Sequence, residues 1–275
     1  MGAIKQYFKE QFQLRMLFLD HIKPSDFYLS CWQSTRSSVP LLLIRVLLFL
    51  TSLGIALYSS ILYMKFGWFK FWFIYLTHWG LTLNTLATGF AVAVSARCHF
   101  YGPITSGTLP WYVRIYWLLF NIATPLAFLI TIFYWTLLYN AGVEEELNHA
   151  LDVCVHGVNS VVMFLLLLSS AQPARLLHAH QPLLLAVVYV VFGAVFYAAG
   201  GTDPFGNPYI YIVVDWANPG PTTALVAITG VLLIVLYAAV VGVAGARDLV
   251  AAKLMRKSEV VVEEAGVPLR QRPQV

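Results

Sequence analysis

Four polar residues recur on one face of an otherwise apolar segment. Residues 151–168 read LDVCVHGVNSVVMFLLLL, and His149, Asp152, His156 and Asn159 follow one another at intervals of three, four and three. In an α-helix this spacing places the four side chains on one face, with Leu, Val and Phe opposite. Because polar groups are costly in hydrocarbon unless they have a partner, this face must look into a helix bundle or a wet cavity.

A second apolar segment carries matching polar residues. It reads FWFIYLTHWGLTLNTLATGF, in which Thr77, Asn84 and Thr88 recur at intervals of seven and four, with His78 beside them. If the two segments enter a membrane near residues 70 and 149, Thr77 and His156 each lie roughly 10 Å inside it at a rise of about 1.5 Å per residue. The two side chains are therefore expected to face each other at one depth.

A hydroxyl beside an imidazole is the arrangement of a nucleophile and its base. Thr77 is the candidate nucleophile and His156 the candidate base, and Asp152, one turn away, would orient the imidazole as the third member of a triad does. Hydrogen bonds to a developing oxyanion would come from a supporting set of polar residues, namely Asn159, His78 and Asn84. The residues thus define a candidate site for covalent catalysis inside a membrane.

Two other interpretations of these polar faces stay open. Polar side chains often hold membrane helices together without doing chemistry. A transport path would need polar residues through the whole bilayer, but the stretch MFLLLLSS follows Asn159, and the last two apolar segments are nearly bare of ionisable groups. A pocket closed on one side is therefore favoured over a channel.

The composition indicates what positions these residues. The 275-residue chain is 59% hydrophobic and 11% charged, whereas a soluble domain has about 45–50% apolar and about 25% charged residues. Six segments have the roughly 20 apolar residues that a spanning helix needs: residues 40–64, 71–95, 113–138, 150–170, 181–199 and 222–245. We therefore expect an all-α, polytopic protein with six transmembrane helices. Its partner is the lipid bilayer, with no nucleic acid, no cofactor and no metal.

The basic residues predict the orientation. With both termini cytosolic, 14 of the 17 Lys and Arg residues lie in cytosolic segments, whereas Lys65 and Lys70 lie outside, as the positive-inside rule requires. Arg45, in the first turns of span one, is expected to snorkel back to the cytosolic interface. The loop with Glu144, Glu145 and Glu146 then faces outward.

Three regions result from this division of the chain. Residues 1–39 form a cytosolic or interfacial N-terminal segment, residues 40–245 the six-helix transmembrane domain, and residues 246–275 a cytosolic tail that is expected to be disordered. The N-terminal segment mixes charges with Phe, Leu and Met, so it is predicted either to lie in the membrane interface or to be a loose tail.

The last outer loop is a candidate lid. It reads GGTDPFGNPYIYIVVDWANPG, and its apolar YIYIVVDW portion, with Asp215 and Trp216, could roof the polar pocket; a plain interfacial loop is the alternative.

His178 and His180 form a lone H-x-H, which is a weak signal for a metal. The three cysteines, Cys31, Cys98 and Cys154, are too few for a disulfide framework.

Several strings resemble a known family. HGVNSVVM, SDFYLSCW and above all the GGTD…GNPYIY…DW…PG block look like the rolling stone proteins, and the resemblance covers about residues 10–250. It implies a multi-pass membrane protein with a role in cell–cell fusion of the myoblast type or in a related membrane process.

That family is distantly similar to the androgen-induced membrane proteins. These are intramembrane hydrolases of fatty acid esters of hydroxy fatty acids, with a Thr nucleophile and a His. The resemblance implies that Thr77, in YLTHWGL, is the nucleophile of a lipid-ester hydrolase. Where that family has N-H-G-M-H-T, this chain has VHGVNSV and a single histidine. Either His156 is the base, or the catalytic position holds Asn159 and the chemistry is lost; both registers stay open.

Overall fold

The computed structural model describes residues 2–105, 107–139 and 149–264 of the chain. The six apolar helices predicted from the sequence are present in these residues. They run over Val39–Lys65, Leu76–Tyr101, Trp111–Leu138, His149–Ser169, Leu176–Ala198 and Pro219–Met255, each long and apolar enough to cross a membrane. The described residues contain no β-strand beyond one isolated bridge between Tyr211 and Val214. The all-α fold class is confirmed, whereas the orientation of the termini stays a prediction.

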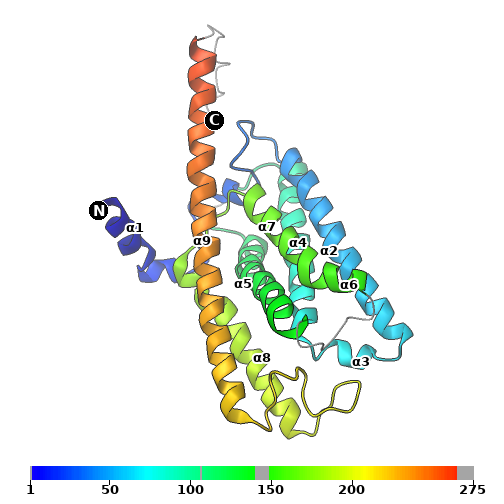
Figure 1. Cartoon of the computed structure of the whole chain (residues 1–275). Helices are drawn as coiled ribbons and strands as arrows, with labels where there is room; N and C mark the ends of the chain where they lie inside the picture. The colour runs from blue at the N-terminus through cyan, green and yellow to red at the C-terminus, as the bar shows by residue number, and fades with distance from the viewer. Residues whose placement is uncertain (1, 106, 140–148, 265–275) are drawn as a thin grey trace.

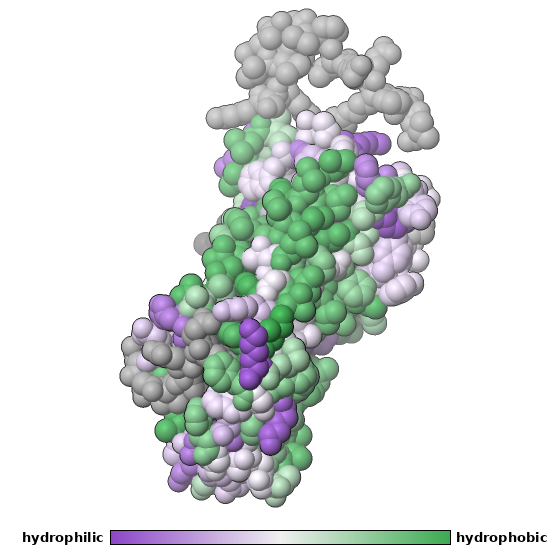
Figure 2. All heavy atoms as spheres, turned by 90° about the vertical axis from the view of Figure 1, so that its right-hand side faces the viewer, coloured by the Kyte–Doolittle hydropathy of each residue, from purple (hydrophilic) through white to green (hydrophobic). Residues whose placement is uncertain are grey.

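Four helices form a bundle and two stand beside it (Figure 1). The bundle consists of α2 (Val39–Lys65), α4 (Leu76–Tyr101), α5 (Trp111–Phe133) and α7 (Asn159–Ser169), with α4 packed most extensively against α2 and α5. The remaining two helices, α8 (His180–Ala198) and α9 (Pro219–Glu264), pack against α5. Apolar side chains cover the middle of the face drawn in Figure 2, as lipid contact requires.

Short elements connect the spans. At the N-terminus they are α1 (Gly2–Gln11) and the 3₁₀ turns Leu14–Leu17 and Pro24–Phe27; later come α3 (Phe69–Trp72) and the 3₁₀ turn Leu176–Ala179. Arg175 ties the N-terminal segment to the bundle by donating to the backbone oxygens of Phe18 at 2.8 Å and Asp20 at 2.6 Å. Phe8, Phe12 and Phe18 are exposed, and an interfacial position for this segment stays a prediction.

Two helices contain a π turn, in which each backbone N–H bonds five residues back. One covers Tyr134–Leu138 at the end of α5, and the other covers Cys154–Val158 between α6 (His149–Val153) and α7. A π turn adds one residue to an α-helix and therefore rotates the remainder of that helix by about 100°. This insertion lies within the polar stripe predicted for residues 149–159.

The second span begins later than predicted. The sequence placed its start at residue 71, but α3 ends at Trp72 and Tyr75 is extended, so α4 begins at Leu76. The backbone N–H of Leu76 donates to the hydroxyls of Tyr189 and Tyr211, each at 3.0 Å. These two side chains satisfy a donor that the first turn of a helix leaves unpaired.

α9 continues past the predicted boundary at residue 245 and ends at Glu264, since residues 246–264 contain no Gly or Pro that would end a helix; the predicted disorder of the tail stays a prediction. The prediction for Arg45 is wrong. Arg45 does not snorkel to the interface, since it is fully buried. Residues 144–146 lie outside the described residues.

Arg45 instead connects several elements. Its guanidinium donates to the backbone oxygens of Phe27 and Ala91, to the hydroxyls of Ser95 and Ser170, and to Tyr116, over distances of 2.7–3.2 Å. Its carbon Cζ lies 5.1 Å from the centroid of the Tyr116 ring. Snorkelling fails because so many acceptors converge inside the bundle.

We expect Arg45→Leu to lower the free energy of unfolding by roughly 3 kcal/mol or more, because hydrogen bonds to a charged group are lost and buried acceptors remain unpaired. Unfolding of the detergent-solubilised protein on heating or on titration with a harsher detergent measures this. Arg36→Leu, at an exposed position, is the matched control. Equal stability of the two variants would contradict the role of Arg45.

Candidate functional site

His156 is held by two neighbours. Its Nδ1 lies 3.1 Å from the backbone oxygen of Asp152 and 3.7 Å from the Asp152 carboxylate oxygen Oδ1. Its ring stacks on that of Tyr134, with centroids 3.5 Å apart and planes within 4°. The hydroxyl of Tyr134 donates to Asp152 Oδ1 at 2.7 Å. Asp152, His156 and Tyr134 therefore form one connected, buried group.

The contacts within this group determine which ring nitrogen of His156 carries the proton. A backbone carbonyl only accepts hydrogen bonds, so Nδ1 beside the Asp152 oxygen carries the proton. The lone pair then lies on Nε2, and a base role falls to that atom. Both π turns meet here, since Tyr134 opens one and His156 lies within the other. Such turns occur frequently at functional sites.

Thr77 differs from the other threonines of α4. The hydroxyls of Thr82, Thr85 and Thr88 donate to backbone oxygens four residues earlier in the helix, at 2.8–2.9 Å. Thr77 lies in the first turn, where no helical carbonyl precedes it, and its hydroxyl makes no hydrogen bond to any described residue. Thr77 is a buried residue, so its hydroxyl lies inside the protein without a hydrogen-bond partner among the described residues.

Thr77 and His156 line the same cavity. This small cavity, of about 50 Å³, is walled mainly by aromatic side chains; its lining residues are Tyr63, Trp68, Tyr75, Thr77, Tyr134, Leu138, His156, Pro204, Phe205 and Tyr211. The expectation that the two candidate residues face one pocket agrees with this geometry. Their roles stay proposals.

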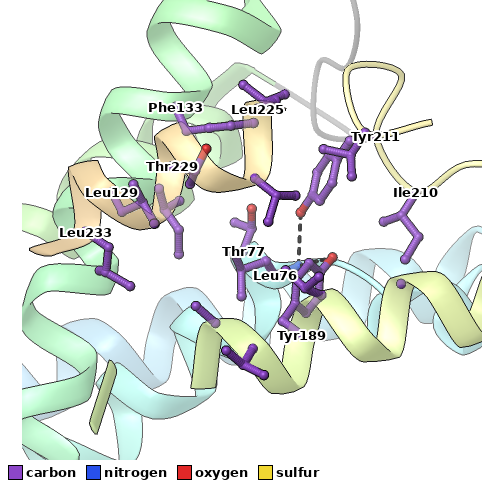
Figure 3. A pocket seen from close by; sticks show the side chains of 18 of the residues that line it. Leu76, Thr77, Leu129, Phe133, Tyr189, Ile210, Tyr211, Leu225, Thr229 and Leu233 are labelled. Carbon is purple, nitrogen blue, oxygen red and sulfur yellow. Dashed lines mark hydrogen bonds between the residues drawn. The ribbon is translucent and has the colours of Figure 1, made fainter. Parts of the chain in front are cut away.

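A second, large cavity of about 370 Å³ adjoins it. Its walls come from the ends of α4 and α5, from α8 and α9, and from the loop between these two, and they are almost entirely apolar. Four residues line both cavities, namely Thr77, Tyr134, Leu138 and Tyr211. Figure 3 shows Thr77 in the midst of the large cavity, with Leu129 and Leu233 on one side and Ile210 on the other. A volume and lining of this kind suit an apolar ligand.

The proposed oxyanion donors lie elsewhere. His78 is buried beside α2 and α3, with Nδ1 2.7 Å from the Trp72 backbone oxygen and Nε2 3.3 Å from the Ser59 hydroxyl. Its ring stacks on Trp72 with centroids 4.6 Å apart. His78 lines neither cavity and holds α2, α3 and α4 together.

The polar helix face predicted for residues 149–159 is only partly present in the structure. His149 is exposed, and Asn159 donates to the Val155 backbone oxygen at 3.0 Å without lining either cavity. The π turn between them rotates Asn159 away from the face that a regular helix would share with His156. Asn84 is also buried away from both cavities.

The loop between α8 and α9 covers part of the large cavity. Trp216 lines it, together with Tyr209, Ile210 and Tyr211. Asp215 does not; its carboxylate accepts from the Ala217 backbone N–H at 3.0 Å and from the Asn218 side chain at 2.8 Å, which shapes the turn before α9. The lid residues thus divide into one that faces the cavity and one that forms the turn.

Among the described residues, no three His, Cys, Asp or Glu side chains come together in a way that would hold a metal ion. His178, of the H-x-H pair, is buried with its Nδ1 2.9 Å from the side-chain nitrogen of Asn121.

Sequence reasoning missed the aromatic residues of the site. Tyr134, which stacks on His156 and bonds Asp152, lies between Phe133 and Trp135 in an apolar stretch and shows no periodic polar signal. Tyr209 and Tyr211 belong to the YIYIVVDW portion that the sequence offered as a roof of the pocket or as an interfacial loop, but neither was named as a residue of the site.

Comparisons with known proteins show the family of this chain. A family profile described as "Protein rolling stone" matches residues 3–262. The chain belongs to the rolling stone family. Protein rolling stone of Drosophila melanogaster is 32% identical over 220 residues, covering 76% of this chain and 78% of that protein. No solved structure matches. Family membership and the six apolar helices together show a multi-pass membrane protein.

We expect Tyr134→Phe to lower the free energy of unfolding by about 2 kcal/mol, because the buried Asp152 carboxylate loses a hydrogen-bond donor while the ring stack remains. Tyr134→Leu, which removes the stack as well, should cost more. The same unfolding assays measure both. Tyr139→Phe, at an exposed tyrosine, is the control, and an unchanged stability of Tyr134→Phe would argue against the hydrogen bond to Asp152.

Proposed function

We propose that this rolling stone family member is an intramembrane hydrolase of lipid esters, with Thr77 as nucleophile and His156 as general base. One observation carries the proposal: a threonine hydroxyl that bonds no described residue and an imidazole of assigned tautomer line one small cavity, which shares Thr77 with a large apolar cavity. The ester group of a lipid would thus lie in the small cavity beside Thr77, and its hydrocarbon chain in the adjoining large cavity.

The reaction can be written with these atoms. Thr77 Oγ1 attacks the ester carbonyl carbon while its proton passes to His156 Nε2. The tetrahedral intermediate collapses, its bond to the leaving alkoxide breaks, and the alkoxide takes the proton from His156. Water then attacks the acyl–Thr77 ester, again with His156 as base, and releases the carboxylic acid and the free threonine.

Two features would stabilise the charges that develop in these steps. The Asp152 carboxylate stabilises the imidazolium that forms on His156, as the acid of a triad does. Thr77 lies in the first turn of α4, so the oxyanion develops near the positive end of a helix dipole. The substrate class is a lipid ester such as a fatty acid ester of a hydroxy fatty acid, which has no charged group near the scissile bond.

A role in cell–cell fusion without catalysis, which the resemblance to the rolling stone proteins implies, is the second candidate. Under this alternative the polar residues only hold the spans together, as the bonds of His78 to Trp72 and Ser59 do. Loss of Thr77 or His156 would then lower the amount of folded protein and the fusion activity in parallel.

Hydrolysis of a fatty acid ester of a hydroxy fatty acid by the purified protein in detergent tests the proposal. We expect Thr77→Val, of nearly the same shape, to lower turnover by about 10³-fold or more. His156→Gln should lower it by about 10²–10⁴-fold, because a general base is lost. Thr77→Ser should keep part of the activity.

The control is Thr82→Val, which removes a hydroxyl of the same helix that bonds only the His78 backbone oxygen among the described residues. It should leave turnover within about twofold, since this hydroxyl lines neither cavity. Full turnover by folded Thr77→Val, or no hydrolysis of any lipid ester by folded wild type, would reject the enzymatic proposal and leave the fusion alternative.

A further inference from the structure

The large cavity has two unlike ends. Beyond Thr77 on one side it is bounded by Leu126, Leu129 and Leu233, which belong to one cluster of buried apolar side chains. On the other side it is bounded by Tyr209, Tyr211 and Trp216 of the loop between α8 and α9, whose rings carry polar atoms. We call the first part the deep arm. It is suited to a hydrocarbon chain, whereas the loop side suits a group with some polarity.

One face of α9 forms a wall of the deep arm. The cavity is lined by Leu225, Val226, Thr229, Gly230 and Leu233, which recur at helical spacing. From Leu225 to Leu233 this wall is about 12 Å long at a rise of about 1.5 Å per residue. It offers an elongated surface, as an extended chain requires.

Gly230 interrupts this face. A Cβ built at position 230 would meet no heavy atom within 4 Å, although Val226 and Leu233, one turn to either side, both line the cavity. Gly193 of α8 lines the same cavity, but a Cβ there would lie 3.3 Å from Trp216 Nε1. The missing side chain of Gly230 therefore leaves open space in the wall, whereas the space beside Gly193 is filled.

We propose that the deep arm binds one long, unbranched acyl chain with its carbonyl end at Thr77, and that the absence of a side chain at Gly230 lets the chain extend past this point. The identity of this chain as the acyl part of a substrate rests on the proposed hydrolase function. Its binding rests only on the cavity, so the two are tested separately. A side chain at position 230 would shorten the site and exclude long chains while admitting short ones.

Gly230→Leu tests the site. Leucine favours helix more than glycine does, and the Cβ meets no neighbouring atom, so the variant is expected to fold. Ala227→Leu, at an exposed position on another face of α9, is the control for an added apolar side chain. Both changes are made in the Thr77→Val background, so that binding is measured without hydrolysis.

Binding of palmitate and of octanoate to the detergent-solubilised protein is measured by native mass spectrometry. We expect the Gly230→Leu variant to bind palmitate at least tenfold more weakly and octanoate within about twofold of the Gly230 parent, with Ala227→Leu unchanged for both. No binding of palmitate to the Gly230 parent, or an equal loss of both fatty acids in Gly230→Leu, would overturn the proposal.

Hydrolysis by the corresponding Thr77 proteins separates this inference from the proposed function. If the Gly230 change shifts the chain length that is bound but no ester is hydrolysed, the acyl-chain site is supported and the hydrolase function is rejected. If Thr77 hydrolyses esters with the same chain-length preference in Gly230→Leu as in wild type, the hydrolase function is supported and the role of Gly230 is rejected.

Discussion

Asp152 lies fully buried within a span and holds two neighbours at once: its carboxylate accepts from the Tyr134 hydroxyl, and its carboxylate and backbone oxygens lie beside His156 Nδ1. A carboxylate in such a place is strongly destabilising unless the protein supplies its partners. The carboxylate accepts from the Tyr134 hydroxyl, whose ring stacks on His156, and the Asp152 backbone oxygen holds the proton of His156 on Nδ1 and so leaves the lone pair on Nε2. The burial of Asp152 is the constraint on which the site depends.

Much of the fold can be predicted from the sequence because a bilayer restricts the choices. With no water to bond the backbone, each apolar stretch must be a helix, so all six spans could be placed from hydropathy. The ends of the helices are less predictable. The start of α4 at Leu76 depends on hydroxyls of Tyr189 and Tyr211, more than 100 residues away in the chain. The burial of Arg45 similarly depends on acceptors from distant elements, and charge alone does not reveal them.

The site is predictable to the extent that helices are regular. Equal depth in the membrane placed Thr77 and His156 in one pocket, and the structure has both lining one cavity. Asn159 was assigned to the same face on a 3.6-residue period, which the π turn at Cys154–Val158 breaks. His78, next to Thr77 in sequence, points about 100° around the helix and packs on Trp72 instead. Tyr134 gave no signal because its role comes from packing against another span.

The proposed hydrolase depends on activation of the Thr77 hydroxyl by His156. Reaction of the purified, folded protein with a fluorophosphonate, followed by peptide mass spectrometry to locate the adduct, tests this activation. We predict a phosphonyl group on Thr77 Oγ1 that is absent when His156 is replaced by glutamine. Folded protein that stays unlabelled, or an adduct on another residue that persists without His156, would contradict it.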